Sequence, residues 1–90
     1  MSNEEVAETL EELARLLEVR KELIFKILSY RRAAAAIRVL DVPLVEYRKL
    51  HDLEDIAGVG EAIAKKVNEL LDTGSLSLLD ELRQSSAGKR

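Results

Sequence analysis

Apolar residues recur every three or four positions along most of the chain, which is the spacing that places them on one face of an α-helix. The first segment begins with Ser2 and Glu5, which have the spacing of a capping box, where each side chain satisfies a backbone N–H of the other residue. The first helix is predicted to bury a face of four apolar residues: Val6, Leu10, Leu13 and Leu17.

Proline and glycine divide the rest of the pattern into shorter helices. A second helix is predicted from near Glu22 to about Leu40, because Pro43 disfavours helical geometry in the residue before it. Pro43 itself suits the first turn of a short third helix that reaches about Leu50. A further helical turn, a tight loop and a fourth helix are predicted at 53–56, 57–60 and 61–72.

The last part of the chain is predicted to hold one more short helix. Gly74 lies where a helix ends in a left-handed residue. Ser77 and Asp80 have the spacing of a weaker capping box for a helix over 78–82, and residues 85–90 are predicted to be a disordered polar tail. The predicted fold class is therefore all-α, a compact bundle of four to five short helices that forms a single domain over residues 1–84.

The composition excludes several classes of function. The chain has 90 residues, no cysteine and one histidine. The absence of cysteine excludes a thiolate zinc site and a thiol nucleophile, and with one histidine we do not expect a histidine metal cluster or a serine triad. We therefore expect no metal and no cofactor. Because the chain has no long apolar run and its N-terminus is acidic, we also expect no membrane association and a cytoplasmic location.

Charge is distributed unevenly although the net charge is only −3. Residues 1–18 carry six acids and one base, whereas residues 19–51 carry eight bases and three acids. A strong non-specific nucleic-acid binder is usually basic overall. Any site for an anion in this chain is therefore local, and the middle third is where we expect it.

The most specific local pattern is a pair of glycines around one apolar residue, Gly58-Val59-Gly60, between two short predicted helices. We expect the glycines to adopt backbone torsions that a side chain forbids, and the turn to direct free N–H groups outward at the start of the second helix, where they attract phosphate. Apolar residues frame the turn with helical spacing: Leu53, Ile56, Ile63, Ala64 and Val67.

This pattern, over about residues 53–72, resembles the helix-hairpin-helix motif of DNA-repair proteins, which holds a DNA backbone phosphate without reading bases. A tight turn in an ordinary helical bundle is the alternative. The resemblance extends over residues 3–83, since Tyr30-Arg31-Arg32-Ala33-Ala34, Pro43 and Leu71-Asp72-Thr73-Gly74 are similar to the N-terminal small domain of family X DNA polymerases, most of all the archaeal and bacterial members.

The resemblance implies a role at a gap in DNA. It implies backbone-phosphate binding at Gly58, Val59 and Gly60, and places Lys26 and Tyr30 in the pocket for a 5′-phosphate. Some members of the family are deoxyribose-phosphate lyases, and the resemblance places their catalytic lysine, which forms a Schiff base, at Lys66.

The chain departs from the family pattern at several charged positions. Two basic positions of the family pocket are Ala62 and Leu78 here, and Glu61 stands at the start of the phosphate-facing helix. Lys65 is a candidate phosphate contact and a positive neighbour for Lys66. Alternatively, both lysines form a solvated helix face that pairs with Glu61 or Glu69.

The second predicted helix carries a second line of apolar residues. Its buried face is set by Ile27, Tyr30, Ala33, Ala34 and Ile37. Four others lie within about 60° of one another and about 140° from that face, at roughly 100° per residue. With Leu23 at the N-terminal end they form what we call the apolar stripe: Leu23, Ile24, Leu28, Ala35 and Val39.

The apolar stripe has three interpretations: a part of the core, a homodimer seam, or an interface for another protein. Arg31 and Arg32 flank it as a polar rim, and Tyr47 on the next short helix is a candidate aromatic anchor. In similar natural domains the residues at positions 28 and 35 are often charged, whereas here they are leucine and alanine.

The pattern therefore favours a non-catalytic binding module. We interpret it as an engineered protein binder, and an inhibitor of its target, that uses the apolar stripe on a polymerase-X-like scaffold. An engineered protein would have no native compartment. The alternative is a DNA-binding domain that grips the backbone and 5′-phosphate of gapped DNA, with lyase activity through Lys66.

Overall fold

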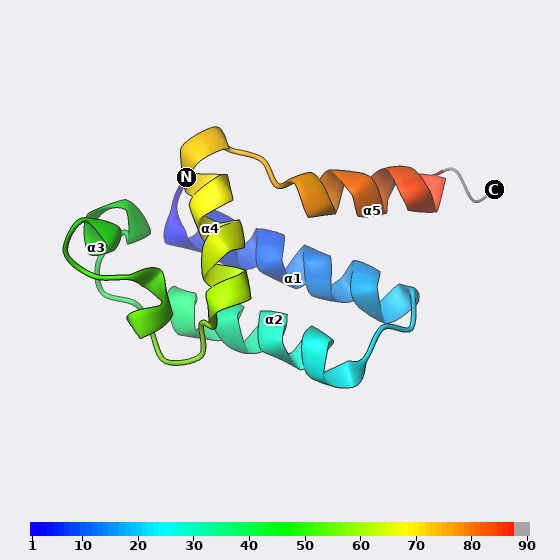
Figure 1. Ribbon diagram of the computed structural model, residues 1–90, viewed down its shortest axis with the longest axis horizontal. Coiled ribbons are helices and arrows are strands. Elements are labelled where there is room, and N and C mark those ends of the chain that lie inside the picture. The colour runs from blue at the N-terminus through cyan, green and yellow to red at the C-terminus, as the bar shows by residue number, and fades with distance from the viewer. Residues whose placement is uncertain (88–90) are drawn as a thin grey trace.

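The computed structural model describes residues 1–87, which form five α-helices and one 3-10 turn and no strand. The predicted all-α fold class is confirmed. Figure 1 shows the order of these elements along the chain: α1 (Asn3–Val19), α2 (Ile24–Arg38), α3 (Leu44–Leu50), η1 (Leu53–Asp55), α4 (Glu61–Thr73) and α5 (Ser77–Ala87).

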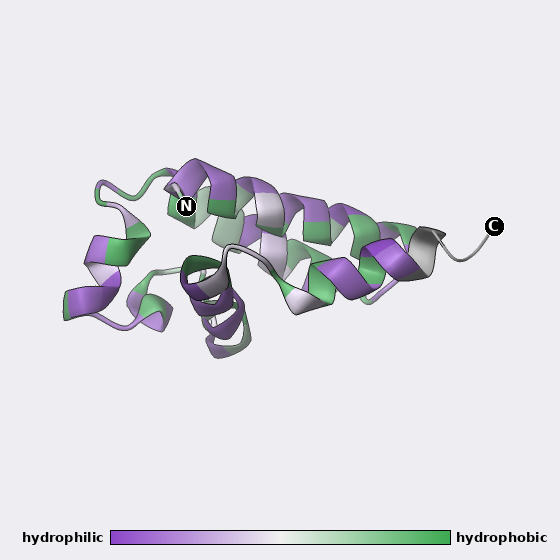
Figure 2. Ribbon diagram, turned by 90° about the horizontal axis from the view of Figure 1, so that it is seen from above, coloured by the Kyte–Doolittle hydropathy of each residue, from purple (hydrophilic) through white to green (hydrophobic). Residues whose placement is uncertain are grey.

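Helices α1 and α2 lie side by side and antiparallel, and they form the base of the fold (Figure 1). Hydrophilic and hydrophobic positions alternate across the α1 ribbon, as in an amphipathic helix (Figure 2). The predicted buried faces of both helices are confirmed. The residues that α1 and α2 bury are Val6, Ala7, Leu10, Leu13, Ala14, Leu17, Ile27, Tyr30, Ala33, Ala34 and Ile37.

Polar contacts fix the ends of α1. Ser2 accepts a hydrogen bond from the Glu5 N–H at 3.1 Å, and the Glu5 carboxylate accepts one from the Ser2 N–H at 2.8 Å, so the predicted capping box is present. These bonds lower the pKa of Glu5. Arg38 at the end of α2 pairs with Glu4 at 3.1 Å and with Glu11, which ties the far end of α2 to α1.

The turn between α1 and α2 holds a lysine in the left-handed region. The Glu22 N–H donates to the Leu17 carbonyl at 3.0 Å, and the Lys21 N–H donates to the Glu18 carbonyl at 3.0 Å. This is the Schellman pattern, whose left-handed position is usually glycine. Lys21 occupies it with φ 60°, and α2 begins at Ile24 rather than near Glu22.

The other helices close the core over α1 and α2. Helix α4 runs steeply across them, and α5 lies along α1 (Figure 1). The apolar residues that these elements bury are Leu44, Leu53, Ile56, Val59, Ile63, Ala64, Val67, Leu70, Leu76, Leu79 and Leu82. Arg83 on α5 pairs with Glu12 on α1 at 2.7 Å, which fixes the position of α5.

Side chains far apart in sequence hold the short helix α3. Asn3 donates to the Val42 carbonyl at 2.9 Å and accepts from the Leu44 N–H at 2.8 Å. Arg48 donates to Asn68 at 2.9 Å and pairs with Asp72 at 2.7 Å on α4. These contacts hold α3 between the N-terminus and α4.

The predicted capping box at the start of α5 is wrong. Ser77 is the first residue of α5, and its N–H and hydroxyl donate to the Glu69 carboxylate of α4 at 2.8 and 2.6 Å. The Asp80 N–H donates instead to the Leu76 carbonyl at 3.1 Å. Since the bond from the Ser77 hydroxyl stabilises the charged carboxylate, the pKa of Glu69 is lowered.

The C-terminal helix is longer than predicted. It runs through Ala87, so the expected polar tail is helical over residues 85–87, and residues 88–90 lie outside the described part of the chain. Gly74 ends α4 with φ 79°, as predicted. Over residues 1–87, none of the helices combines the length and the apolarity that a bilayer span requires.

Lys21 generates a prediction about stability. A side chain in the left-handed region costs roughly 1–2 kcal/mol, and glycine avoids this cost but loses more entropy on folding. We expect Lys21→Gly to raise the free energy of unfolding by about 1 kcal/mol, measured by urea denaturation with an unchanged slope.

Lys21→Ala is the matched control, because it removes the same charge but keeps the Cβ in the left-handed region. It should give no such gain. An equal gain from both variants would mean that charge, not backbone conformation, makes Lys21 unfavourable.

Candidate functional site

The loop between η1 and α4 packs against α2 at Gly58. Gly58 has φ +97°, and a Cβ built there would lie 3.4 Å from the Ala36 Cβ and 3.4 Å from the Arg32 Cγ. The torsion therefore favours glycine at this position, and a Cβ there would only just reach van der Waals contact with these two side chains. Val59 is buried beside it, and its N–H donates to the Ile56 carbonyl at 3.0 Å.

Gly60 does not adopt a backbone conformation that requires glycine. Its φ of −87° and ψ of 178° are open to any residue, so the prediction that both glycines adopt torsions forbidden to a side chain is wrong for Gly60. A Cβ built on Gly60 would meet no atom of the described chain within 4 Å. The missing side chain at Gly60 therefore leaves open space at the start of α4 and relieves no internal crowding.

The start of α4 presents its first N–H groups without a side-chain cap. Gly60 is the N-cap residue, and Glu61 is the first residue of the helix. The Gly60 carbonyl accepts the Ala64 N–H at 2.9 Å, which begins the helical hydrogen bonds. An uncapped N-terminus attracts negative charge. The Glu61 side chain is exposed at the same end and opposes an incoming anion.

A groove of about 660 Å³ lies between α2 and the hairpin formed by η1, the loop and α4. We call it the hairpin groove. Its polar lining comes from Lys26, Ser29, Tyr30, Arg32, Glu61 and Lys66, and its other lining residues are Phe25, Gly58, Val59, Gly60, Ala62, Ile63 and Leu78. The groove therefore unites the predicted phosphate residues of α2, the predicted glycine loop and Lys66.

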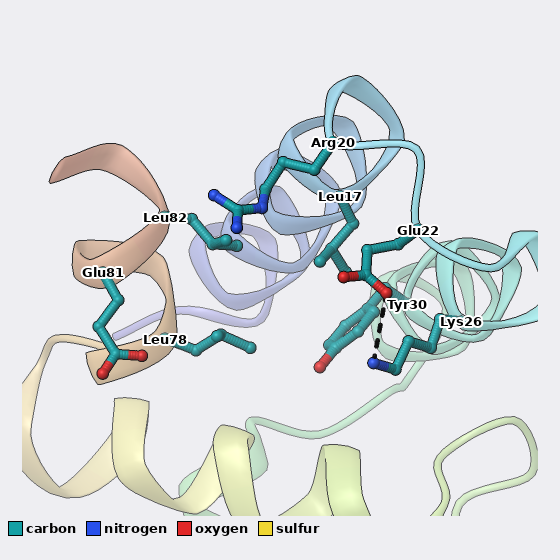
Figure 3. A pocket seen from close by; sticks show the side chains of 8 residues that line it. All are labelled: Leu17, Arg20, Glu22, Lys26, Tyr30, Leu78, Glu81 and Leu82. Carbon is teal, nitrogen blue, oxygen red and sulfur yellow. Dashed lines mark ion pairs between the residues drawn. The ribbon is translucent and has the colours of Figure 1, made fainter. Parts of the chain in front are cut away.

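A second hollow, of about 340 Å³, lies between α1, α2 and α5. Lys26, Tyr30 and Leu78 line both spaces. Figure 3 shows the Tyr30 hydroxyl and the Leu78 side chain pointing into the space between α2 and α5. Lys26 pairs there with Glu22 at 3.6 Å, so an anion that binds Lys26 competes with this carboxylate (Figure 3).

Tyr30 is the buried polar residue of this region. Only 8% of the residue is exposed, and burial raises the pKa of its hydroxyl above the ordinary value. The phenol therefore stays protonated near neutral pH and can donate a hydrogen bond to an anion.

Two neighbouring lysines on α4 have different positions. Lys66 lines the hairpin groove, whereas Lys65 lines a separate hollow with Asp52, Glu54 and Glu61. The structure thus does not bring Lys65 together with the other predicted phosphate residues. In the described part of the chain neither lysine forms an ion pair, so the predicted pairing with Glu61 or Glu69 is absent.

Sequence reasoning missed Phe25 and did not assign Arg32 to this site. Phe25 is 63% exposed and lines the groove together with Ser29 and Arg32. The signal that could have found them is spacing, because positions 25, 29, 32 and 36 lie on one side of a helix. That side of α2 faces the hairpin.

The apolar stripe lies outside the core. Ile24 is 62% exposed, Leu28 44% and Val39 78%, while Leu23 and Ala35 are also exposed. The interpretation of the stripe as part of the core is therefore excluded. No residue of the stripe lines the hairpin groove.

The side chains predicted to surround the stripe have partners of their own. Arg31 pairs with Glu18 on α1 at 2.7 Å. Arg32 packs its Cγ close to Gly58. Tyr47 is half-buried against the core, with its ring centroid 4.8 Å from that of His51. Tyr47 is thus not a free aromatic side chain.

Comparisons with known proteins agree with this architecture. A model of the helix-hairpin-helix domain matches residues 1–76. The chain is 29% identical, over 84 residues, to the DNA polymerase/3′-5′ exonuclease PolX of Bacillus subtilis (strain 168). That match covers 93% of this chain and 14% of the relative, so the chain spans a small part of that protein's length. The predicted relation to family X DNA polymerases is confirmed, and the chain belongs to the helix-hairpin-helix domain family.

Proposed function

We propose that this domain binds the phosphate backbone of DNA through the hairpin groove. The observation that carries the proposal is that one groove unites Lys26, Tyr30 and Lys66 with the glycine loop of the hairpin. Membership in the helix-hairpin-helix family and the similarity to PolX, a DNA polymerase by its name, support it.

The groove offers an anion three kinds of donor. Lys26 and Lys66 supply charge, the Tyr30 hydroxyl supplies a neutral donor, and the start of α4 supplies backbone N–H groups. None of these contacts depends on base identity. The proposed binding is therefore independent of sequence, and it falls with salt as counterions are released.

Nearby acids limit the strength of this binding. Glu61 stands at the start of α4, and Asp52 and Glu54 lie on the η1 side with Lys65. The duplex would therefore approach from the α2 side of the hairpin, away from Asp52 and Glu54, whereas Glu61 lines the groove itself and weakens the binding. Phe25 stands exposed on the approach side, where an unpaired base at a gap can stack on its ring.

The two neighbouring lysines provide the first test. We expect Lys66→Ala to weaken binding to a gapped duplex with a 5′-phosphate by about tenfold, which corresponds to ~1.4 kcal/mol. The slope of affinity against salt should fall by about one. Fluorescence anisotropy at about 50 mM salt measures both quantities.

Lys65→Ala is the matched control, since it removes the same charge from the same helix on the side of the acids. It should change the affinity by less than about twofold. Equal losses from the two variants would contradict a site in the groove and would indicate only general attraction to charge.

Gly60 provides an independent test of the hairpin. Because a Cβ at Gly60 meets nothing inside the chain, Gly60→Ala should lower stability by less than about 1 kcal/mol. The added methyl group would occupy the space where a phosphate approaches, so DNA affinity should fall by roughly tenfold or more. Thermal unfolding and anisotropy on the same preparation separate the two effects, and an unchanged affinity would contradict the contact at the loop.

Lyase activity through Lys66 is the chemical extension of this function. The Lys66 amine would attack the aldehyde of an abasic-site sugar, water would leave, and a Schiff base would form. The presence of Lys66 in the groove with Lys26 and Tyr30 supports this step, whereas Ala62 and Leu78 add no charge to it.

Borohydride trapping tests the lyase step directly. Reduction in the presence of abasic DNA should link the protein covalently to DNA, and peptide mapping should find the link at Lys66. Lys66→Ala should abolish it and Lys65→Ala should not. DNA binding without any trapped product would leave the domain non-catalytic.

Protein binding through the apolar stripe is a second candidate function. The observation that favours it is the exposure of Ile24 and Leu28, since burying one such side chain stabilises a complex by roughly 1.5–3 kcal/mol. The stripe and the groove occupy different sides of α2, so the two functions are compatible. The engineered origin and the inhibition of a target stay predictions.

A further inference from the structure

We propose that the partner of the apolar stripe is a second copy of this chain, packed antiparallel against it along α2. The inference rests on the second candidate function and is independent of DNA binding. It begins from the order of exposed residues on one side of α2.

The spacing of the stripe is symmetric. Ile24, Leu28, Ala35 and Val39 are separated by four, seven and four residues. A two-fold axis that passes between Arg31 and Arg32 therefore places Ile24 opposite Val39 of the second copy. The same axis places Leu28 opposite Ala35 of the second copy. Every helical residue of the stripe gains an apolar mate, over a seam about 22 Å long at 1.5 Å per residue.

The sizes of the mated side chains are complementary. Leu28 is large and Ala35 is small, so the leucine of one copy fills the space that the alanine of the other leaves. Such alternation allows two helices to approach to about 8–10 Å. A different partner protein would not require a large and a small residue at equal distances from the midpoint of the helix. A two-fold dimer does require it.

The two arginines at the centre of the stripe point away from the proposed contact between the two copies. Arg31 is drawn toward α1 by Glu18 at 2.7 Å, and Arg32 is packed against Gly58 at the hairpin. At about 100° per residue they stand on opposite sides of the stripe. Their charges still repel those of the second copy, and this repulsion sets how the complex responds to salt.

The effect of salt on affinity therefore distinguishes this dimer from the complex with DNA. Screening weakens the repulsion between arginines and strengthens apolar contacts, so the dimer should become tighter by about tenfold between roughly 50 mM and 1 M salt. Binding of DNA should weaken over the same range. An acidic partner protein would also bind less tightly at high salt. The direction of the salt effect therefore distinguishes a second copy of this chain from an acidic partner.

Analytical ultracentrifugation of the whole chain, from about 10 μM to 1 mM, tests the proposal. We expect a monomer–dimer equilibrium that shifts toward dimer with salt. Leu28→Asp should abolish the dimer and leave helical circular dichroism and DNA binding intact. Leu50→Asp is the control, because Leu50 is 83% exposed on α3, outside the stripe. This substitution should leave the monomer–dimer equilibrium unchanged. A monomer at 1 mM in high salt would overturn the proposal.

A size swap tests the register even if Leu28→Asp fails to fold. Ala35→Leu adds apolar surface but overfills the seam, so it should weaken the dimer. Combining it with Leu28→Ala restores one large and one small residue at each contact and should recover most of the affinity. A stronger dimer from Ala35→Leu alone would contradict the register.

Cross-linking provides a third measurement, because the chain has no cysteine of its own. A Leu28→Cys chain mixed with an Ala35→Cys chain should form a mixed disulfide dimer under diamide. Each variant alone should link slowly, since like positions lie about 10 Å apart along the seam. Faster linking of Leu28→Cys to itself would show a parallel pairing and overturn the antiparallel one.

Discussion

The contact between Gly58 and α2 holds the site together. Gly58 lies in the left-handed region and rests on Ala36 and Arg32, so the hairpin loop can pack directly on the backbone side of α2. This contact fixes the start of α4 relative to α2 and thereby makes one wall of the hairpin groove. A side chain at Gly58 would be strained by the φ of +97°, although its Cβ would fit at 3.4 Å from Ala36 and Arg32. This wall of the groove therefore depends on a left-handed residue that glycine adopts without strain.

Charge decides which side of the hairpin can meet DNA. The chain is acidic overall, and Asp52 and Glu54 lie with Lys65 on the η1 side, whereas Glu61 at the start of α4 borders both sides. Lys26, Lys66 and Tyr30 line the opposite side. A net charge of −3 thus does not exclude a site for an anion, because at physiological salt charges more than about 8 Å apart are largely screened. What matters is the local ring of donors around the groove.

The sequence was sufficient to predict the helices, because the three-and-four spacing of apolar residues, Pro43 and Gly74 are local signals. The stripe was predictable for the same reason, since helical angles follow from residue numbers alone. The contacts that link distant segments were not predictable. Ser77 donates its N–H and hydroxyl to the Glu69 carboxylate on another helix, and no short sequence motif predicts those bonds. The sides of α4 that hold Lys65 and Lys66 depend on how α4 crosses α2, which a family pattern places only to within a residue or two.

Helix α2 has a different task on each of its sides, and this explains its weak amphipathic pattern. One side packs on α1 through Ile27, Ala33 and Ile37, and another faces the hairpin through Phe25 and Arg32. The third carries the stripe. Arg32 stands at the border between groove and stripe, packed against Gly58 and adjacent to the two-fold axis of the proposed dimer. Its packing against Gly58 holds this side chain on the hairpin side of α2, so DNA binding and self-association use different surfaces of one helix.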